Sequence, residues 1–387
     1  MIQIIDKSQC CGCTACASIC TQNAITMQPD VMGFLYPVVD KGKCIDCSLC
    51  EKVCAFNDLY DISLNLKEPI VYAARHKNIH EIETSRSGAA FIALSDWILD
   101  SGGVVYGAGY ADHFRVIHKK ATTKEERDEF KGSKYVQSDM NTVFRQVKDD
   151  LKKGLLVLFT GTPCQTAGLN SYLGKKLRKN LFLVDIICHG VPSPYIWNDY
   201  LTYVENKYQS RIVKVDFRNK INGWSSAHIE TFVFENGYVV NLFTLRNLFY
   251  KHIILRKSCG NCKYANFIRP SDITIGDFWG WEKTDKDFNK DDKGVSLVLL
   301  NTEQGQKIFF KCLNELNIIS TTTELCVQPN LVTSSILDEQ SDSFMHDYSK
   351  KGFLYVAKKY GNLGVNYKID QFKKKIILRA KNILSQK

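Results

Sequence analysis

Two groups of four cysteines near the N-terminus carry the clearest chemical pattern in the chain. Each group reads C-x2-C-x2-C-x3-C, first as Cys10, Cys13, Cys16 and Cys20, and again as Cys44, Cys47, Cys50 and Cys54. The first three cysteines of a group reach one four-iron cluster from a tight loop, whereas the fourth lies too far along the chain and ligates the other cluster. We therefore predict two 4Fe-4S clusters. The first quartet is Cys10, Cys13, Cys16 and Cys54, and the second quartet is Cys20, Cys44, Cys47 and Cys50.

Zinc and disulfides explain this pattern less well. Zinc sites commonly use two C-x2-C pairs across a longer gap, which leaves the third and fourth cysteine of each group without a role. A disulfide framework suits a small secreted domain, but this chain has 387 residues, and residues 1–20 lack the apolar stretch of a signal peptide. Thr21 and Ala55 stand where proline commonly follows the fourth cysteine, which concerns loop geometry rather than ligation. Cys11 is out of register, and we expect it not to be a ligand.

Four further cysteines, the core quartet, fall where strands of an α/β sheet are expected to end: Cys164, Cys188, Cys259 and Cys262. The first two follow the apolar runs 155–159 and 181–187, which are typical of buried strands. Because adjacent strand ends converge on one crevice, the core quartet can form a third metal site. Spacing alone leaves an iron-sulfur cluster and zinc both open there. Cys312 and Cys326 are interpreted as small apolar core residues.

The elements that must position these residues alternate between strands and helices after a short ferredoxin-like repeat. Strands are predicted at 70–75, 104–110, 116–121, 155–159, 181–187, 212–217, 229–234, 238–243, 271–278 and 295–300. Helices are predicted at 89–99, 141–153, 192–208 and 304–316, with a short one after Thr123. The βα units mixed with hairpins favour an α+β or α/β fold class with a central sheet. No GxGxxG or GxxxxGK[ST] motif supports a standard nucleotide fold.

The chain divides by composition into a two-cluster ferredoxin domain (1–60), a linker (61–69), a mixed α/β domain (70–325) and a C-terminal extension (326–387). The net charge of +10 resides in the last part, since residues 350–387 hold eleven Lys or Arg and one acid. The rest carries 40 of the 51 basic and 40 of the 41 acidic residues, so we expect no nucleic-acid partner. The pattern of residues 366–387 predicts a basic amphipathic helix. It could pack on the body of the same chain, or bind an acidic protein or an anionic membrane surface. We expect a cytoplasmic protein, at most peripheral to the inner face of the membrane.

Several strings resemble the beta subunits of coenzyme F-420 hydrogenases and dehydrogenases, over nearly residues 70 to 310. They are residues 132–138 (GSKYVQS), 161–165 (GTPCQ), 188–194 (CHGVPSP) and 271–280 (SDITIGDFWG). That family includes the chloroplast 7-hydroxymethyl chlorophyll a reductase and bacterial members with a fused two-cluster ferredoxin, which this chain resembles most. The bacterial members frequently occur with enzymes of surface-polysaccharide synthesis.

The resemblance implies a FAD site beside a third 4Fe-4S cluster held by the core quartet. The flavin-binding residues that it implies are Ser87, Gly88, Ser133, Lys134, Tyr135, Gln137, Thr160, Gly161 and Thr162. Glycines allow backbone N–H groups to approach a diphosphate, and a lysine offsets its charge. Relatives commonly have Ser-Gly-Gly where this chain has Ser87-Gly88-Ala89, which puts close backbone approach at Ala89 in question. His189 is the candidate proton donor near the flavin.

We therefore predict an iron-sulfur flavoprotein oxidoreductase. Electrons would come from a low-potential donor such as ferredoxin or another redox protein, pass through the clusters to FAD, and reduce an organic substrate or coenzyme. The alternatives are an electron-transfer subunit without its own small-molecule substrate and a cluster-bearing redox sensor or scaffold.

Overall fold

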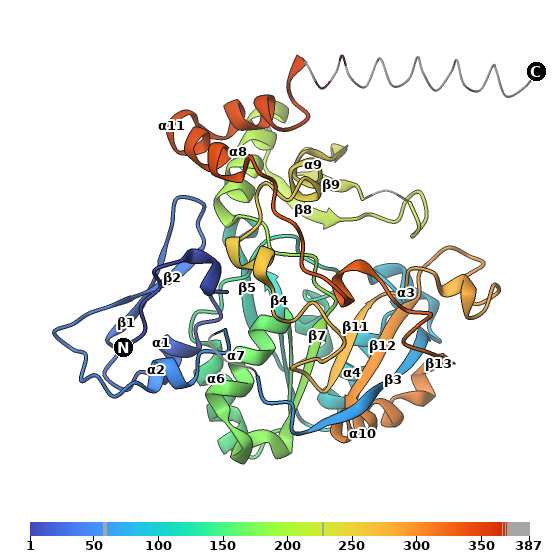
Figure 1. Ribbon diagram of the computed structural model, residues 1–387. Coiled ribbons are helices and arrows are strands. Elements are labelled where there is room, and N and C mark those ends of the chain that lie inside the picture. The colour runs from blue at the N-terminus through green and yellow to red at the C-terminus, as the bar shows by residue number, and fades with distance from the viewer. Residues whose placement is uncertain (57–59, 227, 366, 368, 370–387) are drawn as a thin grey trace, which may run out of the picture.

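A computed structural model describes residues 1–56, 60–226, 228–365, 367 and 369 of the chain. It has three parts, which are an N-terminal unit with a two-stranded sheet, a body on an eight-stranded sheet, and a lobe with a three-stranded sheet. Figure 1 shows the N-terminal unit in blue beside the body and the lobe in yellow-green above it. The predicted fold class, a ferredoxin-like unit followed by a mixed α/β domain, is confirmed.

The N-terminal unit builds the same loop twice. Its elements are η1 (Lys7–Gln9), α1 (Ala15–Ile19), β1 (Ile25–Pro29), β2 (Leu35–Val39) and α2 (Leu49–Lys52), and the two strands pair antiparallel. Each helix begins between the second and third cysteine of a group, directly after Thr14 or Ser48. Both residues have a left-handed backbone, with φ of 70° and 57°. This conformation is unfavourable for residues with a side chain and concentrates at functional loops, so its repetition marks both loops as shaped for a ligand.

The sheet of the body has the order β13-β3-β12-β11-β7-β6-β4-β5. Its strands are β3 (Asn65–His76), β4 (Val104–Tyr110), β5 (Val116–Ala121), β6 (Val157–Gly161), β7 (Leu181–Ile186), β11 (Ile273–Asp277), β12 (Ser296–Thr302) and β13 (Leu316–Thr321). The central strands β11, β7, β6 and β4 are parallel, and antiparallel strands extend the sheet on both sides. The carboxyl ends of the parallel strands therefore meet at one edge, where ligands of such sheets usually bind.

Helices cover both faces of this sheet. They are α4 (Ala90–Asp100) and α10 (Glu303–Lys311) on one face, and α6 (Val143–Lys152) and α7 (Pro163–Leu173) on the other. In β6 the side chains alternate accordingly, since Val157 and Phe159 pack toward α6 and α7 while Leu158 packs toward α4. The N-terminal unit docks on the α6 and α7 side, where Cys13 and Phe56 join the same buried cluster.

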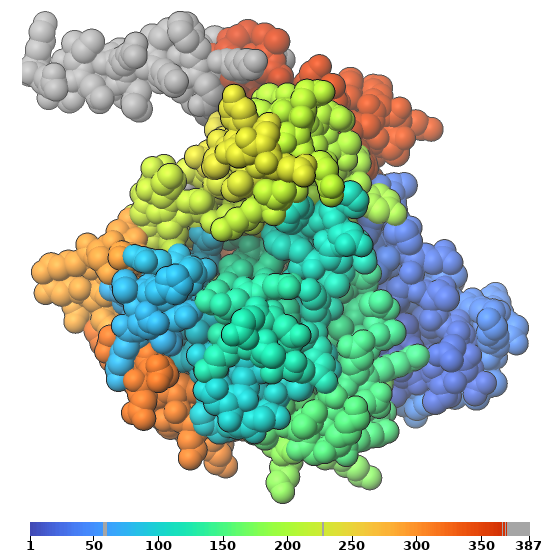
Figure 2. All heavy atoms as spheres, turned by 180° about the vertical axis from the view of Figure 1, so that it is seen from behind, coloured from blue at the N-terminus to red at the C-terminus, as the bar shows by residue number. Residues whose placement is uncertain are grey.

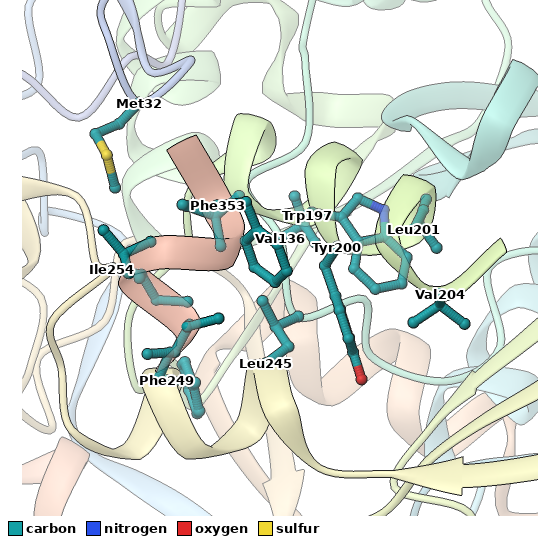
Figure 3. Close-up of a cluster of buried hydrophobic side chains, with 14 of the residues drawn as sticks. Met32, Val136, Trp197, Tyr200, Leu201, Val204, Leu245, Phe249, Ile254 and Phe353 are labelled. Atoms are coloured by element: carbon teal, nitrogen blue, oxygen red, sulfur yellow. The ribbon is translucent and has the colours of Figure 1, made fainter. Parts of the chain in front are cut away.

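The lobe has its own aromatic core, shown in Figure 3. It consists of α8 (Pro194–Tyr208), β8 (Ile212–Phe217), β9 (Glu230–Phe234), β10 (Val239–Leu242), α9 (Thr244–Tyr250) and α11 (Ser341–Lys359). Trp197 and Tyr200 of α8 contact Phe232 of β9, and Tyr200 also contacts Phe353 of α11. Each of these large apolar side chains contributes about 1.5–3 kcal/mol by burial. Tertiary packing therefore holds α11, which the sequence analysis did not predict.

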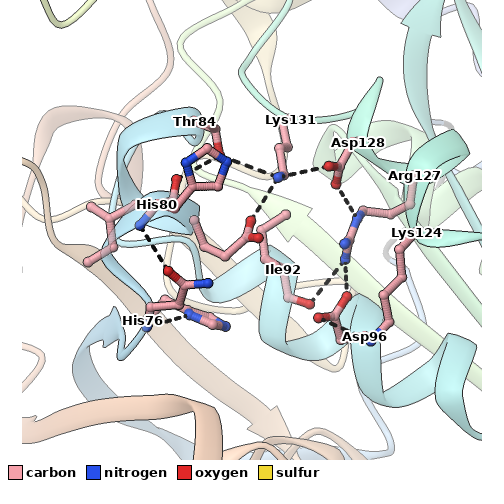
Figure 4. A network of polar contacts seen from close by, with 12 residues as sticks. His76, His80, Thr84, Ile92, Asp96, Lys124, Arg127, Asp128 and Lys131 are labelled. Carbon is pink, nitrogen blue, oxygen red and sulfur yellow. Dashed lines mark hydrogen bonds and ion pairs between the residues drawn. The ribbon is translucent and has the colours of Figure 1, made fainter.

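A polar network fixes α3 (Ile79–Thr84), α4 and α5 (Lys124–Asp128) against one another (Figure 4). Buried Arg127 pairs with Asp96 at 2.6 Å and donates to the Ile92 carbonyl at 3.3 Å. Lys131 pairs with Asp128 at 3.0 Å and donates to Thr84 at 3.3 Å. The network thus anchors the start of the loop that continues into residues 132–138.

Most strand predictions agree with the structure, and β4, β5 and β8 have the predicted bounds. The predicted helix 304–316 is too long, because α10 ends at Lys311 and β13, which was not predicted, begins at Leu316. β3 begins at Asn65, so part of the predicted linker lies in a strand. The basic helix expected at 366–387 falls almost wholly outside the described residues. Across the part of the chain that is described, no helix has the length and apolar character that crossing a membrane requires.

Candidate redox site

The first quartet gathers cysteines from both halves of the N-terminal unit. Cys16 lies in α1, and Cys54 lies two residues after the end of α2. Burial, followed by the neighbouring Cys10 and Cys54 thiols, raises the pKa of Cys16 to about 12. A thiol with this pKa is protonated at neutral pH, and only a bound metal would keep it as a thiolate. Cys54 therefore lies near Cys16, as the predicted crossing requires, and Cys50 of the second quartet lies near it as well.

The second quartet lies at the surface. Its four cysteines, Cys20, Cys44, Cys47 and Cys50, line one cavity, and Cys47 is exposed. Backbone N–H groups point at two of the sulfurs, since Ala24 N donates to Cys20 Sγ and Ile2 N donates to Cys50 Sγ, both at 3.3 Å. Hydrogen bonds of this kind to cysteine sulfur are typical of iron-sulfur sites and tune their potentials.

The core quartet lines a second cavity, at the carboxyl edge of the sheet. Cys164 begins α7 after β6, Cys188 follows β7, and Cys259 and Cys262 lie at η4 (Lys257–Asn261). Val191 N donates to Cys259 Sγ at 3.4 Å. Burial raises the pKa of Cys259 to about 12 and that of Cys262 to about 11. The strand ends thus bring together four cysteines that lie up to 98 positions apart in the sequence.

The donor sets consist of thiols alone. The second and core quartets each line a cavity with four cysteines. Four cysteine thiolates are the ligand set of a four-iron cluster and also of a structural zinc site. The residues present therefore fit the predicted clusters, and zinc stays open for the core quartet.

Cys11 occupies a position that its sequence register did not reveal. It is buried, lines the core cavity, and its thiol contacts those of Cys13 and Cys164. Cys13 also packs closely against Gly168 of α7, because a Cβ added at Gly168 would lie only 2.6 Å from Cys13 Sγ. The first quartet and the core quartet are therefore direct neighbours across the interface between the N-terminal unit and the body.

A large crevice adjoins the core cavity, and both include residues 188–191. Figure 2 shows the hollow between the yellow-green lobe and the cyan and teal part of the body. Seven of the nine residues predicted to bind flavin line it, namely Ser87, Ser133, Lys134, Tyr135, Thr160, Gly161 and Thr162. Segments 85–91, 130–138 and 160–162 thus come together from three separate parts of the sequence.

The other two predicted flavin residues do not line the crevice. Gly88 lies against the backbone of β3 and β12, where a Cβ would be 2.1 Å from the Ala74 carbonyl oxygen. Gln137 points to the N-terminal unit, and its Nε2 donates to the Cys11 carbonyl at 2.9 Å. Ala89 does line the crevice, with φ of 64°, a conformation that suits glycine better. The departure from Ser-Gly-Gly therefore falls at a left-handed position.

The lining of the crevice contains four cationic side chains, of which Arg86, Lys131 and Arg218 each pair with a carboxylate. It contains the cations Arg86, Lys131, Lys134 and Arg218 and the single carboxylate of Asp277. Burial lowers the pKa of Lys134 to about 7, and its Nζ donates to the Glu129 carbonyl at 2.6 Å. A diphosphate would supply the counter-charge that this ammonium lacks. The turn of Thr160 to Thr162, which begins helix α7, lines the same crevice and would add the favourable field of a helix N-terminus. The residues present therefore fit the diphosphate of FAD.

Beneath the crevice lie polar residues that the sequence did not indicate. His118 Nε2 lies 2.9 Å from the Thr160 carbonyl, and its Nδ1 lies 2.8 Å from Ser138 Oγ, which also accepts from Gln165. Burial lowers the pKa of His118 to about 4, so its ring is neutral at pH 7. These residues hold the Thr160 to Thr162 turn in place. Only Gln165 had a local signal, because it completes a capping box with Thr162 at the start of α7.

His189, the predicted proton donor, lines both the crevice and the core cavity. Its Nε2 lies 2.6 Å from His252 Nε2, and His252 Nδ1 lies 2.6 Å from the Ile336 carbonyl. Because a carbonyl only accepts, we assign Nδ1 of His252 as a donor, its Nε2 as an acceptor, and Nε2 of His189 as a donor. Burial lowers the pKa of His189 to about 4. Its Nε2 proton is thus already engaged, and proton delivery would require this bond to break or Nδ1 to be protonated first.

The fold and the paired cysteine motifs define an iron-sulfur electron-transfer protein of the oxidoreductase class. Residues 155–324 match the family model for the C terminus of the coenzyme F420 hydrogenase/dehydrogenase beta subunit, and residues 9–57 match a 4Fe-4S dicluster domain. The body of the chain thus matches this beta-subunit family over residues 155–324 and carries a dicluster domain in front of it, as the sequence motifs predicted.

A chain in a xenon-derivatized structure of the F420-reducing NiFe hydrogenase complex from Methanosarcina barkeri is 19% identical to this one, with a TM-score of 0.47. The match covers 78% of this chain and 94% of that chain. None of the curated proteins matches this chain.

Proposed function

We propose that the protein is an iron-sulfur flavoprotein oxidoreductase. Electrons enter from a low-potential one-electron donor such as ferredoxin, pass the second, first and core quartets in that order, and reach FAD in the crevice. The observation that carries the proposal is this succession of sites. Cys47 is exposed, Cys13 adjoins Cys164 through Cys11, and Cys188 belongs to both the core cavity and the crevice.

The chain's own residues have distinct roles in this proposal. Lys134 and the Thr160 to Thr162 turn bind the diphosphate, and Ser87, Ser133 and Tyr135 border the rest of the cofactor. When bound, the clusters carry single electrons and the flavin converts them to two-electron chemistry. His189 remains the candidate for proton transfer, from its position between the core cavity and the crevice. The acceptor is an organic substrate or coenzyme.

Iron, sulfide and flavin analysis of the anaerobically purified full chain tests this function. We expect about twelve irons, from three four-iron clusters, and one FAD per chain. About eight irons with zinc in the core quartet would overturn the third cluster. Absence of flavin would favour the alternative, an electron-transfer subunit that has no small-molecule substrate of its own.

A single substitution tests the order of the sites. Cys259→Ser is expected to remove about four irons and to prevent reduced ferredoxin from bleaching the flavin, while the two N-terminal clusters remain. Cys312→Ser is the matched control, because Cys312 is buried at 2% exposure and its thiol donates to the Ile308 carbonyl, away from all three quartets. Flavin bleaching at the unchanged rate in Cys259→Ser would contradict the proposed route.

The wider setting is also a proposal. We propose that the reaction serves surface-polysaccharide synthesis, because the bacterial proteins that the motifs resemble frequently occur with enzymes of that synthesis. We also propose that the basic segment 366–387 brings a cytoplasmic protein to an acidic protein or to the inner membrane face. Sedimentation of the full chain and of a chain ending at residue 365 with anionic vesicles tests the second point. Equal binding of both chains would remove the role of the segment.

A further inference from the structure

Arg256 places a buried positive charge at the interface between the N-terminal unit and the body. Its side chain is 1% exposed, and each of its three nitrogens donates to a neutral oxygen. Nε donates to the Cys10 carbonyl at 2.8 Å, Nη2 to the Leu35 carbonyl at 2.8 Å, and Nη1 to Gln137 Oε1 at 2.9 Å. Among the described residues, no carboxylate forms an ion pair with it. Such an uncompensated buried charge is costly unless another group balances it.

The groups that balance this charge belong to two of the quartets. Nη2 lies 3.7 Å from Cys10 Sγ, a ligand of the first quartet. Three residues further along the chain is Cys259 of the core quartet, whose N–H donates to the Arg256 carbonyl at 2.9 Å. Thiolate ligands carry negative charge, so loaded quartets on both sides would provide the missing counter-charge.

The surroundings of the guanidinium are built to keep it in this position. It lies over the ring of Tyr36, with 4.3 Å between the guanidinium carbon and the ring centroid. Gly12 has φ of 71°, and a Cβ there would lie 2.8 Å from Nη1. The loop of the first quartet therefore closes directly onto Arg256, and a larger residue at position 12 would push it away.

The second quartet has a different electrostatic environment. The residues that line its cavity include no lysine or arginine. The N-terminal ammonium of Met1, which does line the cavity, is paired with Asp46 at 3.0 Å and with Glu51 at 3.2 Å. Arg145 donates to the Cys20 carbonyl at 3.5 Å. A fixed cation stabilises the more negative, reduced state of a nearby cluster, and low-dielectric surroundings strengthen the effect. Arg256 therefore differs from the cations near the second quartet, because it is buried and lies against a ligand sulfur of the first quartet.

We infer that Arg256 raises the reduction potentials of the clusters bound by the first and core quartets above that of the second-quartet cluster. This inference rests on the proposed function, since it requires the clusters to be present. Each transfer moves one electron from the outer cluster, which is oxidised, to an inner one, which is reduced. The electron comes from the external low-potential donor. The bias makes transfer from the surface toward the crevice favourable.

Three variants of the full chain separate the charge of Arg256 from its hydrogen bonds. Arg256→Gln removes the charge, and Arg256→Lys keeps it with fewer donors. Gln137→Glu leaves Arg256 in place and sets a carboxylate against its Nη1, which neutralises the charge. This variant therefore tests the charge even if Arg256→Gln does not bind its clusters. Arg115→Gln is the control, because Arg115 is an exposed cation that pairs with Asp139 at 3.3 Å.

The measurement is a redox titration followed by electron paramagnetic resonance, with iron content determined for each variant. A Cys47→Ser background identifies the signal of the second-quartet cluster. In Gln137→Glu and Arg256→Gln we expect the first-quartet cluster to become at least tenfold harder to reduce, which is about 59 mV for a one-electron couple. Arg256→Lys should shift it less, and the second-quartet cluster should not shift.

Unchanged potentials in a Gln137→Glu protein with full iron content would overturn the inference, as would an equal shift in Arg115→Gln. An equal shift in Arg256→Lys and Arg256→Gln would assign the effect to hydrogen bonds and overturn it as well. Absence of clusters from the unmodified chain would instead contradict the proposed function, so the two failures are distinguishable.

Discussion

Replacing Arg269 by methionine should destabilise the protein and disrupt the core quartet. Arg269 and Asp185 form an ion pair of 2.9 Å, with side chains exposed by 1% and 0%. Asp185 precedes Cys188 by three residues, and Arg269 also donates to the carbonyl of Tyr264, two residues after Cys262. The pair therefore ties together the two segments that carry these cysteines.

The expected loss follows from the burial of the pair. Removing one partner of a buried ion pair leaves the other charge uncompensated and costs about 3–5 kcal/mol. Burial already raises the pKa of Asp185 above its usual value, and loss of the guanidinium raises it further. A carboxyl whose folded pKa is raised loses stability as pH increases past its unfolded value near 4. Arg269→Met should thus be less stable at pH 8 than at pH 5.5.

Urea unfolding of the full chain under argon, followed by circular dichroism, measures this loss. The control Arg115→Met removes an exposed pair and should cost no more than about 1 kcal/mol. Adding Asp185→Asn to Arg269→Met should recover at least half of the loss, because no buried charge remains. A cost equal to that of Arg115→Met, or further destabilisation by Asp185→Asn, would refute the reasoning.

Two other predictions concern the interface and the crevice. Alanine at position 168 has a higher helix propensity than glycine, by about 1 kcal/mol. Gly168→Ala should nevertheless lower the iron content by about four atoms, because the new Cβ displaces Cys13. The control Gly42→Ala should leave the iron content unchanged. Full iron content in Gly168→Ala would refute the tight contact. FAD affinity should fall above pH 7, approaching tenfold per pH unit above pH 8, because only protonated Lys134, with a pKa near 7, offsets the diphosphate. Fluorescence titrations of FAD should show no such slope in Lys134→Gln; an identical slope there would assign the pH dependence to another group.

Local patterns predicted the elements whose signal lies within a short segment. The apolar runs of β6 and β7 and the alternation in β8 to β10 identify buried and half-buried strands without knowledge of their partners. β13 and α11 carried weaker patterns, since only part of each is buried and the partner lies far away in the sequence. β13 pairs with β3, which is about 250 residues earlier in the chain, so the sequence near Leu316 contains no local pattern that predicts a strand.

The candidate site divides in the same way. The strings around Ser133, Thr160 and Cys188 were recognisable, and they do meet at one crevice. Gln137 belongs to one of these strings, yet it contacts Cys11 and Arg256 instead of lining the crevice. Neighbouring side chains in a loop can point to opposite sides, and only the packing around the loop decides which side each one takes.

The sequence by itself indicated the dicluster domain and the resemblance to the beta-subunit family, because cluster ligands are supplied by short loops whose spacing is visible in the chain. The tertiary structure decided which quartet adjoins the core, and it placed Cys11 and Arg256 between them. These contacts join residues about 150 to 250 positions apart, and they depend on how the N-terminal unit docks on α7 and η4. Docking is a property of complementary surfaces, and such surfaces leave no periodic or local pattern in the sequence.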